Sequence, residues 1–114
     1  MKTHLLTEFG QGASLRRLDY TKAAERALKD ALWHNSINLA ELFDKEKTEM
    51  IIDVEVAVAE PDKLDTSALA DVFPYGQISF TAKQGGLNIP RPDGNDTVIA
   101  TVAIKVSLDL EDAV

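Results

Sequence analysis

The sequence contains no cysteine, so the protein can form neither a disulfide framework nor a metal site built on thiolates. Its two histidines are too few to suggest a transition-metal cluster. Basic residues are scarce as well: 12 lysines and arginines stand against 19 acidic residues, which gives a net charge of −7. Such an acidic chain is poorly suited to the phosphates of nucleic acids and to anionic membrane surfaces.

Long hydrophobic runs are also missing. No apolar stretch approaches the roughly 20 residues that cross a bilayer, and residues 1–6 are too short and soon too polar for a signal peptide. We therefore expect a soluble, cytoplasmic protein that needs no cofactor and no metal and binds neither nucleic acid nor membrane. With 45% hydrophobic residues, the 114-residue chain is long enough for one domain over residues 1–114 and too short for two.

Apolar residues at helical spacing predict a helix over residues 20–34, which would end at His34. The buried stripe consists of Ala24, Ala27, Leu28, Ala31 and Leu32. Its small alanines would let the helix lie close against a sheet, and Asp19 or Thr21 would supply the N-cap oxygen. A helical turn is expected within residues 37–43, and a short helix is expected to begin after Asp65.

Alternation of apolar and polar residues predicts four strands. They cover residues 3–9, 50–58, 77–89 and 97–108. The apolar positions change parity at Gly85-Gly86, which predicts a glycine bulge inside the third strand. The element order is therefore βαβαββ, and we predict a single-domain α+β fold whose mixed four-stranded sheet carries its helices on one face.

The end of the first strand is the best candidate for a ligand site. The strand is expected to end at Gly10 and Gly12, where a loop leads to a helix N-terminus that collects backbone N–H groups. Bases in the loop would pair with a carboxylate or a phosphate. The spacing matches neither a P-loop nor a dinucleotide fingerprint, and a tight turn with solvated arginines is the alternative. The candidate ligand-binding residues are Glu8, Gly10, Gly12, Arg16, Arg17, Lys22 and Lys83.

Two of these candidates have alternative roles. Glu8 would act either as a general base or as a structural partner of Lys22 or Arg26. Lys83 would belong to a cross-strand ion network on the polar sheet face, which would be either solvated or enclosed in a subunit interface. The other members of this network would be Asp53, Glu55 and Lys105.

Short motifs along most of the chain resemble a family of conserved hypothetical proteins, sometimes called the Lin family. They are Glu8-Phe9-Gly10 with Gly12, Thr21-Lys22-Ala23-Ala24 with Arg26-Ala27, His34-Asn35-Ser36, Pro74-Tyr75-Gly76 and Gly85-Gly86-Leu87. The family has no established activity. It tends to carry an acid and a His-Gly pair between Gly12 and Asp19, where this chain has Ser14, Arg16 and Arg17.

The element order also resembles the chorismate-mutase-like fold of small trimeric metabolic proteins and of the repeats of ring-opening amidohydrolases. That resemblance implies a homo-oligomer in which the second sheet face or the sheet edges contact sister subunits, with ligand sites between them. Two functions follow. The first is the binding of a small polar or anionic metabolite at clefts between subunits, with hydrolase or isomerase chemistry as its enzymatic form. The alternative is a non-catalytic assembly or protein-interaction module.

Overall fold

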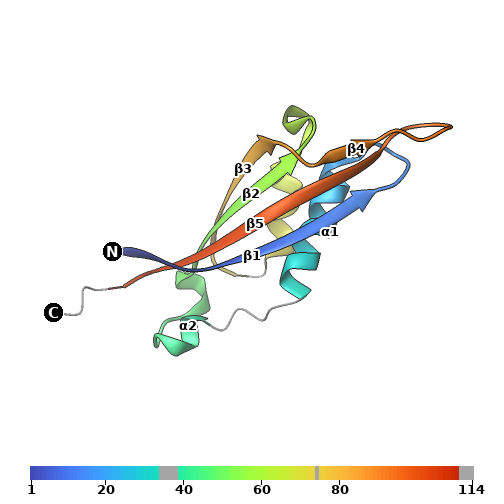
Figure 1. The fold of residues 1–114 in the computed structure, drawn as a ribbon. Coiled ribbons are helices and arrows are strands. Elements are labelled where there is room, and N and C mark those ends of the chain that lie inside the picture. Colours follow the sequence, from blue (N-terminus) through green and yellow to red (C-terminus); the bar gives the residue numbers. More distant parts are fainter. Residues whose placement is uncertain (34–38, 74, 111–114) are drawn as a thin grey trace.

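One mixed sheet and the helices on a single face of it make up the two layers of the fold (Figure 1). The computed structural model describes residues 1–33, 39–73 and 75–110. The strands are β1 (Lys2–Ser14), β2 (Ile51–Val58), β3 (Gln77–Gln84), β4 (Leu87–Ile89) and β5 (Thr97–Asp109). The helices are α1 (Tyr20–Trp33), the short α2 (Leu39–Leu42) and the 3₁₀ segments η1 (Lys47–Glu49), η2 (Pro61–Lys63) and η3 (Thr66–Val72). The predicted α+β class and mixed sheet are confirmed.

Strand β5 is the centre of the sheet, whose strand order is β1-β5-β2-β3. It pairs antiparallel with β1 and with β2, whereas β2 and β3 run parallel. The short strand β4 pairs with residues 97–99 of β5, just beyond Thr101, where the pairing of β2 with β5 stops. Strand β4 therefore continues the position of β2 along β5.

The core lies between α1 and the apolar face of the sheet. The even-numbered residues of β2 and β5, from Ile52 to Val58 and from Val98 to Leu108, are all buried on that face. Four of the five positions predicted for the stripe of α1 are fully buried, and Leu32 is partly buried against the same core. Because the large apolar side chains of β2 and β5 lie mainly on this side, α1 and η3 cover one face and leave the other uncovered.

The glycines of β1 lie inside the strand, so the prediction that the strand ends there is wrong. Strand β1 continues through Gly10 and Gly12 to Ser14, and both glycines face α1. A Cβ atom on Gly10 would lie 2.6 Å from the amide nitrogen of Ala31, and one on Gly12 would lie 2.7 Å from the carbonyl carbon of Arg26. Glycine is required here because the helix backbone approaches the strand backbone directly.

The Gly85-Gly86 pair is a crossing between strands, so the predicted bulge is also wrong. Strand β3 ends at Gln84 beside β2, and the chain then crosses the end of β2 to reach β5 as β4. The amide of Gly85 donates to the carbonyl oxygen of Val58 at 2.8 Å, which holds the crossing against β2. The sheet consequently has five strands, one more than the sequence predicts.

Side-chain caps set the starts of α1 and η3. Asp19 caps α1, because its Oδ1 accepts from the amide of Lys22 at 2.9 Å. Asp65 accepts from the amide of Ser67, which confirms the prediction that a short helix begins after Asp65. This helix is the 3₁₀ segment η3. The hydroxyl of Thr21 instead accepts from the amide of Asp65 and joins the two segments. His34, residues 35–38 and Pro74 lie outside the described residues.

Candidate functional site

A hollow of about 500 Å³ lies where β1 leads into α1. It is lined by Ser14, Leu15, Arg16, Arg17, Asp19, Lys22 and Arg26, and we call it the basic hollow. Four bases against one acid give this lining a formal charge of +3, in a protein whose net charge is −7. The basic hollow is therefore a positive region on an acidic molecule.

Hydrogen bonds from Asn95 and from the first residue of β5, Thr97, hold the backbone of the basic hollow. Asn95 donates its side-chain amide to the carbonyl oxygen of Arg16 at 3.1 Å, and the hydroxyl of Thr97 donates to that of Leu15 at 3.1 Å. Arg26 donates a guanidinium N–H to the carbonyl oxygen of Ala13 at 2.6 Å. The connection between β1 and α1 is thus tied to both neighbouring elements.

Two arginines supply the unused charge of the basic hollow. Among the described residues, the guanidinium groups of Arg16 and Arg17 make no hydrogen bond and no ion pair. Lys22 contacts Glu25 at 3.3 Å, within the first turns of α1. Since Asp19 already accepts from the helix N-terminus, an anion here would be recognised by side chains more than by helix N–H groups.

The structure separates the seven candidate residues into three places. Arg16, Arg17 and Lys22 lie together at the basic hollow. Gly10 and Gly12 are packed under α1, and Glu8 lies on the same helix-covered side because it pairs with Ile104. Lys83 lies on the uncovered face of β3, at the opposite edge of the sheet from β1. A single protomer therefore does not join Lys83 to the other candidates.

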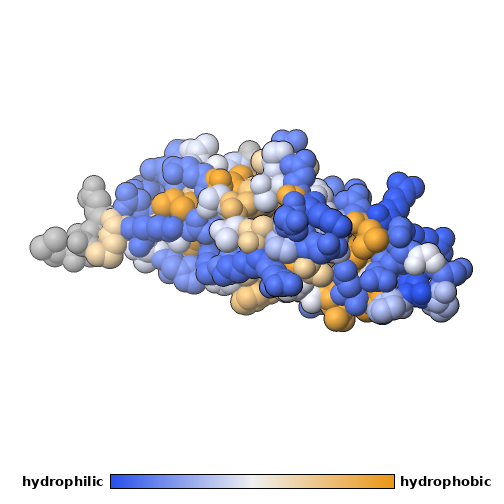
Figure 2. Space-filling view, turned by 90° about the horizontal axis from the view of Figure 1, so that it is seen from above, coloured by the Kyte–Doolittle hydropathy of each residue, from blue (hydrophilic) through white to orange (hydrophobic). Residues whose placement is uncertain are grey.

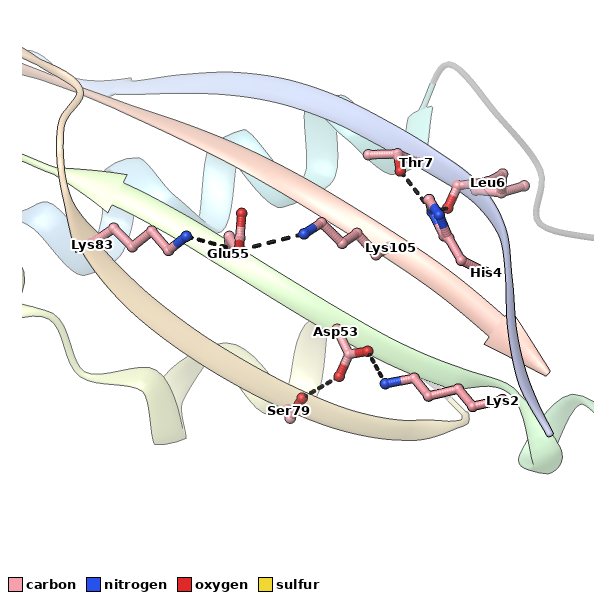
Figure 3. Close-up of polar contacts among 9 residues, drawn as sticks. All are labelled: Lys2, His4, Leu6, Thr7, Asp53, Glu55, Ser79, Lys83 and Lys105. Atoms are coloured by element: carbon pink, nitrogen blue, oxygen red, sulfur yellow. Dashed lines mark hydrogen bonds and ion pairs between the residues drawn. The ribbon is translucent and has the colours of Figure 1, made fainter. Parts of the chain in front are cut away.

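The uncovered face of the sheet carries the predicted ion network (Figure 3). Asp53 accepts from Lys2 at 2.7 Å and from the hydroxyl of Ser79 at 2.7 Å. Glu55 accepts from Lys83 at 2.9 Å and from Lys105 at 3.5 Å. These contacts confirm the cross-strand network within one protomer.

These hydrogen bonds and charges keep both carboxylates ionised. The hydrogen bonds from Lys2 and then Ser79 lower the pKa of Asp53. The hydrogen bond from Lys83, followed by the positive charge of Lys105, lowers the pKa of Glu55. At neutral pH the network is therefore a set of full charges of both signs.

The other half of the uncovered face is mainly apolar, and this feature was not predicted from the sequence. Phe9, Leu87 and Ile89 point to this side and are 69%, 55% and 42% exposed. Phe9 also lines a hollow of about 200 Å³ together with Ala57, Ala103 and neighbouring residues. Figure 2, a view from above, shows hydrophobic residues at several separate places on the surface, including the end of the molecule that carries β4. We call Phe9, Leu87, Ile89 and their neighbours the apolar half of the uncovered face.

A partly buried polar cluster connects β4 to α1. The hydroxyl of Tyr20 donates to Glu60 at 2.8 Å and accepts from the side-chain amide of Asn88 at 2.8 Å. Burial raises the pKa of Tyr20, whereas the hydrogen bond from Tyr20 lowers the pKa of Glu60. Glu60 also pairs with Lys63 at 3.1 Å, so the two contacts of the Tyr20 hydroxyl link α1 to β4 and to the segment after β2.

Neither a metal site nor a membrane helix is seen in the part of the chain that the structure describes. Over residues 1–33, 39–73 and 75–110, no three His, Asp or Glu side chains come together as metal ligands would. Within the same ranges, no helix combines the length and the apolarity that a bilayer crossing requires.

The two-layer fold, with its glycine-packed helix and uncovered sheet face, defines a small α+β domain. A family model of conserved hypothetical proteins (Lin0512_fam) matches residues 4–106, so the chain belongs to that family. This confirms the resemblance seen in the short motifs. No curated protein matches the sequence.

A solved structure shows the same fold at nearly full length. It is the crystal structure of an FtsZ-like protein of unknown function from Nostoc punctiforme, with 28% sequence identity and a TM-score of 0.86. The similarity covers 96% of this chain and 98% of that one. The family and this neighbour therefore establish the fold. A function has to be inferred from the surface residues of this chain.

Proposed function

We propose that this protein is a cytoplasmic homo-oligomer that binds a small anionic metabolite at the basic hollow. The observation that carries the proposal is a pair of guanidinium groups, Arg16 and Arg17, that have no hydrogen-bond or ion-pair partner among the described residues and lie beside a hollow of about 500 Å³. A guanidinium binds a carboxylate or a phosphate through two parallel hydrogen bonds, so two of them favour a ligand with more than one anionic oxygen. The volume suits a small metabolite.

Removal of both arginines tests the ligand part of the proposal. We expect inorganic phosphate or succinate to stabilise the wild-type protein in thermal-shift experiments and to bind in isothermal titration. The double variant Arg16→Ala, Arg17→Ala should bind at least about ten-fold more weakly, because each guanidinium contributes a charge-assisted hydrogen bond. A neutral cyclic amide such as 2-pyrrolidone should have no effect.

Lys45→Ala is the matched control, since it removes one positive charge away from the basic hollow. It should bind the anions as the wild type does. If no anion stabilises the wild type, or if the double variant binds as tightly, the ligand part fails. An oligomer without anion binding would then support the alternative function, a non-catalytic assembly module.

The apolar half of the uncovered face supports the oligomer part of the proposal. Exposed side chains of Phe9, Leu87 and Ile89 lie on the same uncovered face, opposite Ala103, Ile99 and Thr97 of β5, and exposed apolar side chains on one face are typical of protein interfaces. Beside them the ion network has three lysines, Lys2, Lys83 and Lys105, against two acids. The uncovered face is thus close to neutral, so two acidic protomers meet there with the least repulsion.

Charge placed on the apolar half tests this contact. In sedimentation or light-scattering measurements, wild-type protein should be an oligomer and Phe9→Lys should dissociate at least about 30-fold more readily, because an apolar anchor at the centre of a contact is replaced by a charge. Leu42→Lys is the control, since Leu42 is 77% exposed on α2, away from β4. An oligomer unchanged by Phe9→Lys would place the contact elsewhere, and a monomeric wild type would contradict it.

A further inference from the structure

The part of the uncovered face that carries the ion network contains a second hollow, of about 450 Å³. It is lined by Lys2, His4, Asp53, Val54, Glu55, Ser79, Thr81, Lys105 and Ser107, and we call it the charged hollow. Two lysines oppose two carboxylates in this lining, so its formal charge is zero with neutral His4. The basic hollow has a formal charge of +3, so the two surfaces suit different ligands.

Asp53 has little binding capacity left. Its Oδ2 accepts from Lys2 at 2.7 Å, and its Oδ1 accepts from the hydroxyl of Ser79 at 2.7 Å. Both carboxylate oxygens therefore already hold a strong donor, and Asp53 forms a fixed wall of the charged hollow.

Glu55, unlike Asp53, has one carboxylate oxygen that is free to accept hydrogen bonds from a ligand. Both of its lysine contacts end on the same oxygen, Oε1, at 2.9 Å from Lys83 and 3.5 Å from Lys105. Among the described residues, Oε2 has no hydrogen-bond partner, and Figure 3 shows it pointing away from both lysines. An ionised carboxylate oxygen without a donor is a ready acceptor for an ammonium group.

Lys105 is the matching donor without a strong acceptor. Its one carboxylate contact is the 3.5 Å approach to Glu55 Oε1, an oxygen that Lys83 already occupies at a shorter distance. An ammonium group has three N–H donors, so most of the donor capacity of Lys105 is free for a ligand. The charged hollow therefore holds Lys105, which has free donor capacity, beside Glu55, which has free acceptor capacity, on the neighbouring strands β5 and β2.

We infer that the charged hollow binds a small zwitterion of the α-amino acid type. The ammonium of the ligand would be accepted by Glu55 Oε2, and its carboxylate would take donors from Lys105. An α-amino acid carries these two groups on one carbon, and Lys105 lies 3.5 Å from the other carboxylate oxygen of Glu55, Oε1, so the two recognition groups are close enough for both ends of one such ligand. A ligand with a single charge would use only one of the two recognition groups and would gain one charge-assisted contact instead of two.

This inference is independent of the proposed anion site, and its experiment uses different ligands. L-serine, L-alanine and L-glutamine are titrated into the ¹⁵N-labelled wild-type protein, and N-acetyl-L-serine and L-serinamide serve as analogues that lack one charge. We expect saturable shifts of amides near residues 53–55 and 105 for at least one amino acid. The two analogues should bind at least about ten-fold more weakly.

Two variants address the two recognition groups separately. Glu55→Gln and Lys105→Met should each weaken amino acid binding at least about ten-fold, since each removes one charged partner from an exposed network without touching the core. Lys29→Met is the control, because Lys29 belongs to a similar ion pair with Glu25 on α1. The double variant Arg16→Ala, Arg17→Ala should bind amino acids as the wild type does.

The outcomes are distinct. Absence of binding by all three amino acids overturns the inference even if anions bind at the basic hollow. Equal binding of N-acetyl-L-serine would show an anion site instead, and equal binding of L-serinamide would show a cation site. Either result, or binding unaffected by Glu55→Gln and Lys105→Met, contradicts a zwitterion site at this place.

Discussion

A Gly12→Ala variant is expected to lose about 3 kcal/mol of its free energy of unfolding, at the upper end of what overpacking usually costs. The added methyl group would lie 2.7 Å from the carbonyl carbon of Arg26 and even closer to backbone atoms of Ala23 and Ala27. No side chain can rotate away to make room, because all three neighbours are backbone. Helix α1 would have to move off β1, and the alanine stripe beneath it would lose its close packing.

Urea unfolding followed by circular dichroism measures this loss. Gln11→Ala is the control, because Gln11 precedes Gly12 in the same strand and its side chain is exposed on the uncovered face. Its free energy of unfolding should change by less than about 0.5 kcal/mol. A Gly12→Ala variant as stable as the wild type would show that α1 does not need this close approach to the sheet.

Local spacing was sufficient to predict α1, β2 and β5. Ala24, Ala27 and Leu28 repeat at helical spacing and do lie against the sheet, while the alternation in β2 and β5 assigns the buried face correctly. Both signals depend on residues within a few positions of each other. The same local reasoning limited the helix cap to Asp19 or Thr21, and Asp19 is the one that caps α1.

Glycine has two structural uses, and this is why two predictions were wrong. A glycine lets the chain turn, and it also lets another backbone come close. Gly10 and Gly12 serve the second use, but the backbone that approaches them belongs to Ala27 and its neighbours, well along the chain. A single sequence does not show which distant segment lies over a glycine, so a strand that continues to Ser14 was predicted to end early.

The candidate site was predictable only where its residues are near neighbours in the chain. Arg16, Arg17 and Lys22 come together because one connection and one helix turn carry them all. Lys83 lies apart from them because β3 is placed at the far edge of the sheet, and strand order is a property of the whole fold. The apolar half of the uncovered face was missed for the same reason: Phe9 of β1 and Leu87 of β4 lie on opposite sides of β5, so only the strand order places them on one face.

The crossing at Gly86 is the second position where a single methyl group should have a large effect. Gly86 has a φ of +67°, a conformation that costs a non-glycine residue about 1 kcal/mol or more. A Cβ atom there would also lie 3.0 Å from the carbonyl oxygen of Ala57 and closer still to that of Ile99. Strain and collision act together, so Gly86→Ala should lower the free energy of unfolding by about 3 kcal/mol.

Gly94→Ala separates the two causes. Gly94 also has a positive φ, +87°, but the nearest atom to an added Cβ is the flexible guanidinium of Arg91 at 3.7 Å. This variant should therefore lose only the conformational part, about 1 kcal/mol. Amide hydrogen exchange should report faster opening of β4 in Gly86→Ala, because the crossing positions β4 against β5 and brings Asn88 to Tyr20. If Gly86→Ala and Gly94→Ala lose the same free energy of unfolding, the collision of the added methyl group with the backbone at the crossing contributes nothing, and only the positive φ matters.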